Sequence, residues 1–221
     1  MCAIFGSYDK SMFEVLYEAN KERGNFASSI VTIGVEDVYI GKFNGNINFD
    51  KVSYGNDFSY VTGHVQAPTS STREWSYDTS HPFETLSWLV SHNGVLTNEE
   101  ELRDHYVPHV VNPVDTALIV ELLQYFTESE KGKPDPVKSI TKTLNVLQGT
   151  FALSIIDTDT SEIYLARSGS VLHYDRLGNF STNPGIGYTE LPEGDIMRLN
   201  KKTKRWNKVG TFEVNSPFIF L

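Results

Sequence analysis

The chain has 221 residues and a formal charge of −9, from 28 acidic and 19 basic residues. This length suits one domain, residues 1–221, with a core of its own. The negative charge gives nucleic acid and anionic membranes no general attraction. No apolar run approaches the roughly 20 residues of a spanning helix, and the first residues lack the regions of a signal peptide. We therefore expect a cytoplasmic protein that binds neither nucleic acid nor membranes.

The first third of the chain predicts strands around one helix. Ser11 and Glu14 have the spacing of a capping box and precede an apolar face, so we expect a helix over 12–23 that ends at Gly24. A turn near Glu36-Asp37 would join two strands as a hairpin. Apolar and β-branched runs predict strands over residues 3–5, 29–35, 38–40 and 59–62.

The middle third predicts a strand over 87–91 and then three helices. Thr97 and Glu100 form a second capping box, which predicts a short helix ending before Pro108. Asp115 precedes an apolar stripe at helical spacing. Beyond a surface loop over 129–136, Asp135-Pro136 begins a fourth helix that Gly149 stops. The stripe after Asp115 consists of Leu118, Ile119, Leu122, Leu123 and Phe126.

The last third predicts strands over 150–156, 162–166 and 195–199. Residues 157–161 and Leu177-Gly178-Asn179 have the composition of hairpin loops, which favours antiparallel pairing. Predicted strands outnumber predicted helices, and sheets covered by a few amphipathic helices make a layered α+β domain.

Cys2 is the one cysteine, so no disulfide can form within the chain, and a single cysteine argues against a Cys-based zinc site. If Met1 is removed, the new α-amine has a reference pKa of roughly 7.7 to 8.0 and stands beside its own thiol. One residue would then supply both a nucleophile and a base. A cysteine at an arbitrary position is more often a small core residue. Position two is what favours the chemical interpretation.

Three polar segments accompany this thiol, and each lies where we expect a strand to end or a helix to begin. In His92-Asn93-Gly94, an amide and a backbone N–H side by side on a turn can donate to a developing oxyanion. Asn-Gly is also a common plain turn, and Asp115 alone would be an ordinary helix cap. The three segments are residues 63–69, 91–98 and 114–116.

Taken in order, these segments resemble the glutaminase domain of class II glutamine amidotransferases. The resemblance extends along nearly the whole chain and is anchored by the cysteine at position two. It is carried by Met1 to Gly6, Arg23-Gly24, Gly63 to Thr69, His81-Pro82, His92-Asn93-Gly94, Asp115-Thr116, Gly149 to Leu153, Ala166 to Ser170 and Glu193 to Ile196.

The resemblance implies a four-layer αββα sandwich of two antiparallel sheets, with Cys2 at the end of the first strand between them. It also implies that Cys2 forms a thioester with glutamine and releases ammonia, while the Asn93 side chain and the Gly94 N–H hold the oxyanion. Water would then release glutamate. The implied binding residues are Arg23 and Gly24 at the N-terminus, Asp115 for the substrate α-ammonium, and Gln66, Thr69 and His81 around the pocket.

Gln66 departs from the family pattern, which has an arginine here for the glutamine α-carboxylate. A neutral amide cannot form the bidentate charged pair of an arginine. The missing interaction would weaken glutamine binding by about 1.5 to 3 kcal/mol, although Arg73 could replace it. Two alternatives follow: an amidase of the same fold acting on another amide, or a catalytically silent scaffold subunit, which a retained Met1 would also favour.

We expect no cofactor and no metal, because the sequence shows no phosphate loop, dinucleotide fingerprint or ligand cluster. Glutamine is the expected small-molecule substrate. Because the resemblance ends near the apolar tail 218–221, we also expect a separate synthase subunit as ammonia acceptor, with that tail packed on the core.

Overall fold

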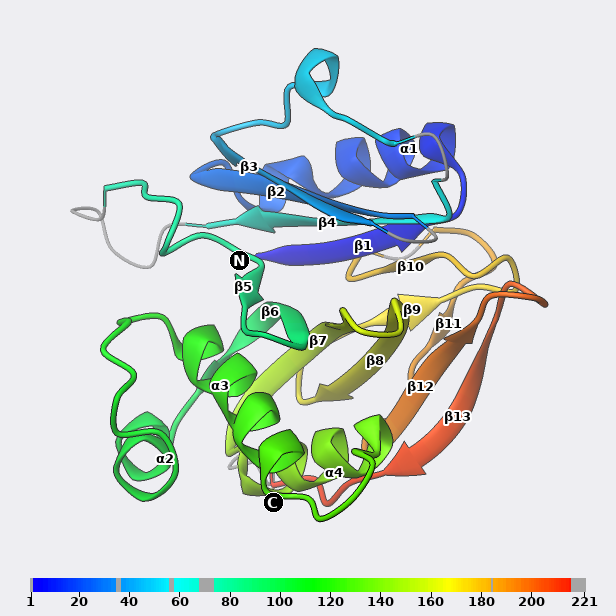
Figure 1. The fold of residues 1–221 in the computed structure, drawn as a ribbon. Coiled ribbons are helices and arrows are strands. Elements are labelled where there is room, and N and C mark those ends of the chain that lie inside the picture. Colours follow the sequence, from blue (N-terminus) through cyan, green and yellow to red (C-terminus); the bar gives the residue numbers. More distant parts are fainter. Residues whose placement is uncertain (1, 35–36, 56–57, 68–73, 184, 216–221) are drawn as a thin grey trace, which may run out of the picture.

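The computed structural model describes residues 2–34, 37–55, 58–67, 74–183 and 185–215. Within them, two antiparallel sheets lie face to face, with helix α1 (Lys10–Asn20) on the outer face of one sheet and helices α3 (Asp115–Glu128) and α4 (Pro136–Val146) on the outer face of the other (Figure 1). The predicted αββα sandwich is therefore confirmed.

The first sheet contains the N-terminal strands. Its order is β11-β9-β10-β1-β4-β2-β3, and each neighbouring pair is antiparallel. Two short 3-10 turns, η1 (Lys21–Arg23) and η2 (Phe49–Lys51), lie between its strands in the sequence. The strands are β1 (Ala3–Ser7), β2 (Ala27–Ile33), β3 (Val38–Asn44), β4 (Tyr60–Gln66), β9 (His173–Tyr174), β10 (Phe180–Ser181) and β11 (Thr189–Glu190).

The second sheet has the order β13-β12-β8-β7-β6-β5 and is also antiparallel. Its longest strands are β6 and β7, which pair with each other. The strands are β5 (Phe83–Glu84), β6 (Trp88–Leu96), β7 (Gly149–Asp157), β8 (Glu162–Ser168), β12 (Asp195–Asn200) and β13 (Arg205–Thr211).

Three apolar cores separate the four layers. Phe5 and Phe13 belong to the core between α1 and the first sheet. Ile4 and Leu165 belong to the core between the two sheets. Leu118 and Leu153 belong to the core between the second sheet and its helices. Neighbours in sequence such as Ile4 and Phe5 enter different cores because successive side chains of a strand point to opposite faces.

Two of the predicted helix starts are wrong. α1 begins at Lys10 because Asp9, not Ser11, is the N-cap, and its carboxylate accepts the Met12 N–H at 2.8 Å. The α-helix ends at Asn20 and continues as η1 to Arg23. Helix α2 (Glu99–His105) begins after Asn98, and no side chain caps it.

The side chain of Asn98 is engaged elsewhere. Its amide donates to the Val146 carbonyl at 2.9 Å and accepts the Gln148 N–H at 3.0 Å, which ties α2 to the end of α4. Asp115 is the first residue of α3 rather than its cap. The predicted cap of α4 is confirmed, since Asp135 accepts the Val137 N–H at 3.0 Å.

The predicted strands are all present, but most run further than predicted. β4 extends to Gln66 and β6 to Leu96, so residues 63–66 and 91–96, which were expected to follow strands, are inside them. The hairpins at 157–161 and 177–179 are confirmed by the antiparallel pairs β7–β8 and β9–β10. β2 and β3 also pair as predicted, although residues 35–36 lie outside the described part. The sequence analysis missed β5, β9, β10, β11 and β13.

The apolar tail 218–221 lies outside the described residues, so its predicted packing is untested. No helix in the described part of the chain is long and apolar enough to cross a membrane.

Candidate active site

Cys2 stands directly before β1, and the alternation of that strand shows which way its side chain points. Ala3 and Phe5 face α1, whereas Ile4 faces the second sheet. Since side chains alternate with a period of two, Cys2 faces the second sheet with Ile4. The Arg23 Nε donates to the Cys2 carbonyl at 3.2 Å, so η1 holds the residue from the side of α1.

β6 presents Asn93 to the same space. Leu89 belongs to the core between the sheets, while Trp88 and Val90 belong to the core under the helices. Odd-numbered residues of β6 therefore face the first sheet, and Asn93 is among them. Asn93 is 7% exposed. The thiol and this amide thus approach each other from opposite sheets.

The Gly94 N–H points off an edge of β6 that, among the described residues, has no partner strand beyond Val90. β5 pairs only with Leu89 and Val90 of β6. The Leu96 N–H, two residues after the Gly94 N–H, donates to Asp115 Oδ2 at 3.1 Å rather than to β7. Because N–H groups two residues apart leave a strand on the same edge, the Gly94 N–H points the same way. Asn93 and Gly94 lie within β6, so the predicted Asn-Gly turn is wrong.

Cys2, Arg23, Asn93 and Gly94 line one pocket of about 630 Å³. The opposite wall is formed largely by small and apolar groups from β7 and from the segment after β8, a region that the sequence analysis regarded as structural. The remaining lining residues are Ala67, Val95, Thr150, Gly169, Ser170 and Val171.

Two glycines are needed for close backbone approach rather than for a turn. A Cβ at Gly94 would lie 1.9 Å from the Thr150 carbonyl oxygen of β7. A Cβ at Gly24 would lie 2.4 Å from the Gln66 carbonyl carbon, so this glycine lets η1 lie against the end of β4. Gly24 has an extended backbone, with φ of −163°, and it ends the helical segment after η1, as predicted.

Asp115 is held by a network behind β6. Besides the Leu96 N–H, its carboxylate lies 3.4 Å from His92 Nδ1, and the Thr116 hydroxyl donates to it at 3.3 Å. Burial pushes the pKa of Asp115 up, but the nearby His92 and the bonds from Leu96 and Thr116 outweigh this effect and hold the pKa below its ordinary value. The carboxylate is therefore ionised at neutral pH, and 16% of the side chain is exposed.

His64 joins the two sheets beside this network. Its Nε2 donates to the His92 carbonyl of β6 at 3.0 Å, and its ring stacks on that of His81 with 3.9 Å between centroids. Burial lowers the pKa of His64 to about 3, so the ring is neutral. A carbonyl can only accept, which assigns the proton to Nε2. His81 Nε2 in turn lies 2.8 Å from the Thr116 hydroxyl.

Gln66 ends β4 with a buried side chain. It lies in phase with Tyr60, which faces the second sheet, so its amide enters the space between the sheets beside the position of Cys2. Its Nε2 donates to the Thr79 carbonyl at 3.4 Å. Its Oε1 is buried and has no hydrogen-bond partner among the described residues. A buried polar atom in that condition costs roughly 1–3 kcal/mol.

The structure thus brings together most of the predicted site residues. Cys2, Arg23, Asn93 and Gly94 share the pocket, and Gly24 lets η1 lie against the end of β4. His81 and Asp115 belong to the adjoining network with Thr116. Thr69 and Arg73 lie outside the described residues.

Sequence reasoning missed the function of His64, which it treated as one scattered histidine among others. If β4 had been predicted to continue to Gln66, strand alternation would have placed the side chains of His64 and Gln66 on the same face of the sheet.

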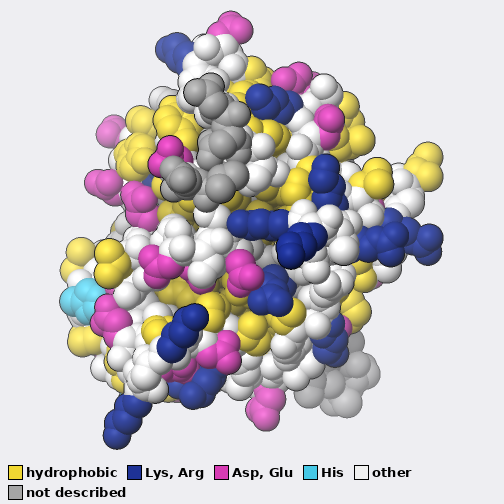
Figure 2. Space-filling model, turned by 45° about the vertical axis from the view of Figure 1, so that its right-hand side comes forward, with side chains coloured by type: hydrophobic (Ala, Val, Ile, Leu, Met, Phe, Trp, Pro, Cys, Tyr) yellow, Lys and Arg dark blue, Asp and Glu magenta, His cyan; other side chains and the backbone are white. Residues whose placement is uncertain are grey.

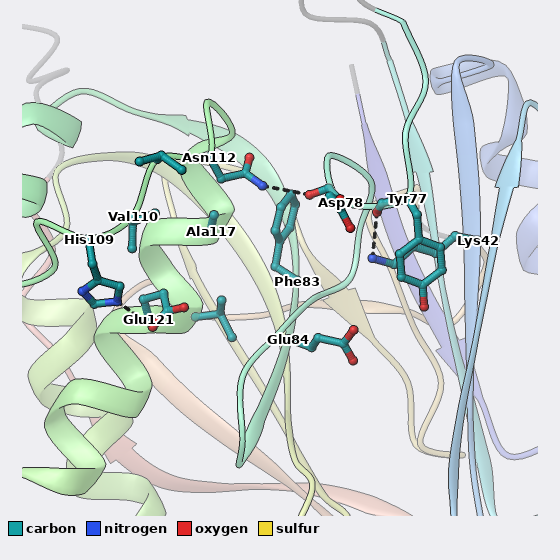
Figure 3. Close-up of a pocket in the computed structure, with 12 residues that line it drawn as sticks. Lys42, Tyr77, Asp78, Phe83, Glu84, His109, Val110, Asn112, Ala117 and Glu121 are labelled. Atoms are coloured by element: carbon teal, nitrogen blue, oxygen red, sulfur yellow. Dashed lines mark hydrogen bonds and ion pairs between the residues drawn. The ribbon is translucent and has the colours of Figure 1, made fainter.

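A second pocket, of about 320 Å³, lies between β3 and α3 (Figure 3). Two of its polar groups are paired within the pocket, since Lys42 Nζ donates to the Tyr77 carbonyl at 3.1 Å and His109 Nε2 lies 3.4 Å from Glu121. The Lys42 amine also lies 4.1 Å from the centroid of the Tyr77 ring. Burial lowers the pKa of Lys42, against the opposing effect of Glu84 and Asp78. We interpret these contacts as fastening residues 77–84 to β3.

The molecular surface is mixed in charge. Figure 2 shows basic side chains gathered around the middle of one face, with acidic side chains among and around them. Charges of both signs are thus interspersed on this face even though the whole chain carries −9.

Comparisons with known proteins agree with this geometry. Residues 78–177 match the family model described as glutamine amidotransferase domain. Glutamine–fructose-6-phosphate aminotransferase (isomerizing) of Staphylococcus epidermidis is 30% identical over 224 residues, which cover 97% of this chain and 35% of that protein. The Staphylococcus aureus protein of the same name is 29% identical over 182 residues, 78% of this chain and 30% of its own length.

Solved structures share the fold. Glutamine phosphoribosylpyrophosphate amidotransferase from B. subtilis superposes with a TM-score of 0.74 at 18% identity, over 95% of this chain and 49% of that one. A predicted glutamine amidotransferase from Pseudomonas aeruginosa superposes with a TM-score of 0.57 at 14% identity, over 95% of both chains.

The two facing sheets with their outer helices define the N-terminal-nucleophile hydrolase fold. Within that class, the chain contains a class II glutamine amidotransferase domain. The chain spans about a third of the length of the curated relatives that it matches.

Proposed function

We propose that the protein hydrolyses the side-chain carboxamide of a glutamine through Cys2 and releases ammonia for transfer to an acceptor. The observation that carries this proposal is the pocket shared by Cys2 from one sheet and by Asn93 and Gly94 from the other. This places a nucleophile opposite donors suited to a developing oxyanion, which is the requirement for acyl transfer.

The first half of the reaction forms a thioester. After removal of Met1, the α-amine of Cys2 takes the thiol proton, and sulfur attacks the carboxamide carbon. The carbonyl oxygen becomes an oxyanion that accepts from the Asn93 amide and the Gly94 N–H. When the tetrahedral intermediate collapses, the C–N bond breaks, the α-ammonium returns its proton to nitrogen, and ammonia leaves.

The second half of the reaction hydrolyses the thioester and regenerates the free enzyme. Water gives a proton to the α-amine and attacks the thioester carbon, the same two donors hold the new oxyanion, and the C–S bond breaks. Sulfur recovers a proton and the carboxylic acid product leaves. Arg23 takes part by fixing the backbone of Cys2, because its Nε bond to the Cys2 carbonyl restrains the residue that carries both reacting groups.

Asp115 supplies a binding site for the substrate α-ammonium. Its carboxylate is held ionised and partly exposed by the His92 and Leu96 contacts. Glu99 is a second carboxyl group close enough to interact with Asp115, since its pKa is raised first by burial and then by the Asp115 charge. An ammonium placed here would be attracted by both carboxylates.

The ammonia acceptor is also part of the proposal. The curated relatives are named for transfer to fructose 6-phosphate and are about three times as long as the matched region. We propose that a synthase unit outside the described residues uses the ammonia, and that this unit is a separate partner subunit.

Replacing Cys2 tests the mechanism. Cys2→Ala should abolish ammonia release, and Cys2→Ser should reduce kcat by several orders of magnitude, because a hydroxyl is a far weaker nucleophile at neutral pH. Ammonia is measured by a coupled assay on purified protein with an unchanged melting curve. Wild-type rates in Cys2→Ala would refute the proposal.

The intact mass of the purified protein provides an independent check. Loss of one methionine is expected, because a retained Met1 would block the amine that serves as base. An uncleaved chain that also fails to react with a thiol-directed glutamine analogue would favour the silent scaffold.

A further inference from the structure

We propose that His64 is a positioning residue of the reaction, which holds the oxyanion donors of β6 in place through its hydrogen bond to the His92 carbonyl. These donors are the Asn93 amide and the Gly94 N–H, which line the pocket with Cys2. The inference rests on the proposed function and extends it to a side chain that does not itself line the pocket.

His64 connects the two halves of the site. In the first sheet, β4 pairs with β1, and the residue opposite His64 is Ile4, two positions after Cys2. The His64 side chain is 1% exposed and reaches the second sheet, where its Nε2 donates to the His92 carbonyl at 3.0 Å. This carbonyl directly precedes Asn93. One side chain therefore relates the backbone before the oxyanion donors to the strand that follows the nucleophile.

The bond lies on the edge of β6 that has no partner strand at this point among the described residues. Backbone groups two residues apart leave a strand on the same edge, so residues 92, 94 and 96 all present theirs here. The His92 carbonyl is bound by His64, and the Leu96 N–H is bound by Asp115 Oδ2 at 3.1 Å. Gly94 lies midway between these two anchors, and its N–H is directed by both.

The planarity of the peptide unit carries the effect from the His92 carbonyl to Asn93. Because the carbonyl of one residue and the N–H of the next lie in one plane, a fixed His92 carbonyl also fixes the backbone that leads into Asn93. On the other edge of β6, Asn93 pairs with β7, and the Thr150 carbonyl oxygen leaves no room for a Cβ at Gly94. Those contacts fix the donors within the second sheet, whereas the His64 bond fixes them relative to the first sheet, which carries Cys2.

The His64 ring is itself held in one orientation. It stacks on the His81 ring with 3.9 Å between centroids and 24° between planes. His81 Nε2 in turn lies 2.8 Å from the Thr116 hydroxyl of α3. A group whose own rotamer is locked by packing and by further hydrogen bonds holds its partner more precisely than a mobile one.

Two amides that differ by one methylene group test this role. The longer amide of His64→Gln brings its nitrogen to about the place of Nε2 and can still donate to the His92 carbonyl, whereas the amide of His64→Asn falls short. We expect His64→Asn to lower kcat for ammonia release from L-glutamine by about 10- to 100-fold, because misplaced oxyanion donors stabilise the transition state less. His64→Gln should stay within about fivefold of the wild-type kcat. KM should change by less than about threefold in both variants, since His64 does not line the pocket.

Tyr60→Phe is the matched control for lost stability. Tyr60 lies on the same strand and face as His64, is equally buried, and donates its hydroxyl to the Gly178 carbonyl at 2.7 Å. Its removal deletes one buried hydrogen bond of the first sheet and should leave kcat unchanged. Melting curves establish that each variant is folded. An equal fall of kcat in Tyr60→Phe and His64→Asn would assign the effect to stability and overturn the inference.

Alkylation of Cys2 by iodoacetamide gives a second readout. The sulfur displaces iodide and its proton passes to the α-amine or to water, so no oxyanion forms and the donors of β6 are not needed. The alkylation rate of His64→Asn should therefore lie within about twofold of the wild-type rate. A fall in this rate as large as the fall in kcat would place the defect at the thiol and refute the role in holding the donors.

Turnover by the wild-type protein separates this inference from the proposed function. If the wild type releases ammonia and folded His64→Asn keeps its kcat within about twofold, the positioning role fails and the thiol mechanism stands. A kcat of His64→Gln as low as that of His64→Asn has the same meaning. A wild type that releases no ammonia from L-glutamine refutes the proposed function and the inference with it. Should His64→Asn not fold, His64→Leu replaces it with the same expected loss, because leucine fills the site without a donor.

Discussion

At the scale of single residues, Gly94 shows how little space the site allows. β6 and β7 approach so closely there that the position of a Cβ lies 1.9 Å from the Thr150 carbonyl oxygen. The same residue directs its N–H into the pocket lined by Cys2. The absence of a side chain at Gly94 therefore allows β6 and β7 to pair closely and keeps the N–H in position for the proposed oxyanion site.

Gly94→Ala should harm stability and activity together. The methyl group meets backbone rather than a movable side chain, so we expect a loss of about 1–3 kcal/mol in unfolding free energy. The displaced N–H should also lower kcat. Chemical denaturation and the ammonia assay check both effects. Gly185→Ala is the control, because its nearest neighbour would lie 3.5 Å from the new Cβ, and it should change neither quantity.

His64 makes a second prediction at this scale, for acid stability. The pKa of His64 is about 3 in the folded protein and about 6.5 in the unfolded chain. Between these pH values the unfolded state therefore binds a proton at His64 and the folded state does not. The stability due to the neutral ring is thus complete above about pH 6.5 and is lost as the pH falls towards 3.

Urea denaturation of the wild type and His64→Gln at several pH values tests this. The variant should lose stability less steeply below pH 6.5, while His105→Gln, at an exposed histidine, should keep the wild-type slope. Identical slopes for wild type and His64→Gln would show that burial does not suppress protonation of His64.

At the scale of elements, β6 uses one open edge for three purposes. The His92 carbonyl accepts from His64, the Gly94 N–H points into the pocket, and the Leu96 N–H binds Asp115. The edge is available because β5 pairs only with Leu89 and Val90. A partner strand of full length would occupy these groups and remove the site.

The start of α1 is a test of capping at this scale. Asp9 accepts the Met12 N–H at 2.8 Å, so Asp9→Ala should cost about 1 kcal/mol of unfolding free energy. Ser11→Ala, two residues on, should change it by only a few tenths, because Ser11 is an exposed residue inside the helix. Thermal or urea denaturation decides between the two, and the opposite ranking would restore Ser11 as the cap.

At the scale of the whole molecule, the site exists only because two sheets are held in register. Cys2 comes from one sheet and Asn93 from the other, and the core between them includes Ile4, Leu165 and Trp206. His64 adds a polar bond across the same interface. Stability of this interface and geometry of the pocket are therefore coupled.

Leu165→Ala tests the coupling between the stability of the interface between the sheets and the geometry of the pocket. The side chain is fully buried between the sheets, so its truncation should cost about 2–5 kcal/mol and lower activity well below the melting temperature. Tryptophan fluorescence during denaturation gives the first quantity and the ammonia assay the second. Leu177→Ala, at a side chain 69% exposed, should alter neither. Full activity in a strongly destabilised Leu165→Ala would show that the pocket tolerates movement between the sheets.

Local patterns in the sequence predicted the features that depend on interactions between neighbouring residues. The stripe from Leu118 to Phe126 and the cap at Asp135 gave α3 and α4, since helical spacing and capping are properties of a few adjacent residues. Cys2, Asn93 and Gly94 were also proposed as a chemical set, because a nucleophile and oxyanion donors are needed for acyl transfer, whereas Asp115 was added to that set by the family resemblance.

The tertiary structure alone decided how these residues are used. Asn93-Gly94 is strand and not turn because β7 pairs with it, and Asp115 binds the Leu96 N–H because β6 passes beside α3. The contacts of His64 and Gln66 form only when β4 pairs with β1 and the second sheet packs on the first. Each of these outcomes depends on contacts between residues far apart in the chain, which periodicity and capping do not encode.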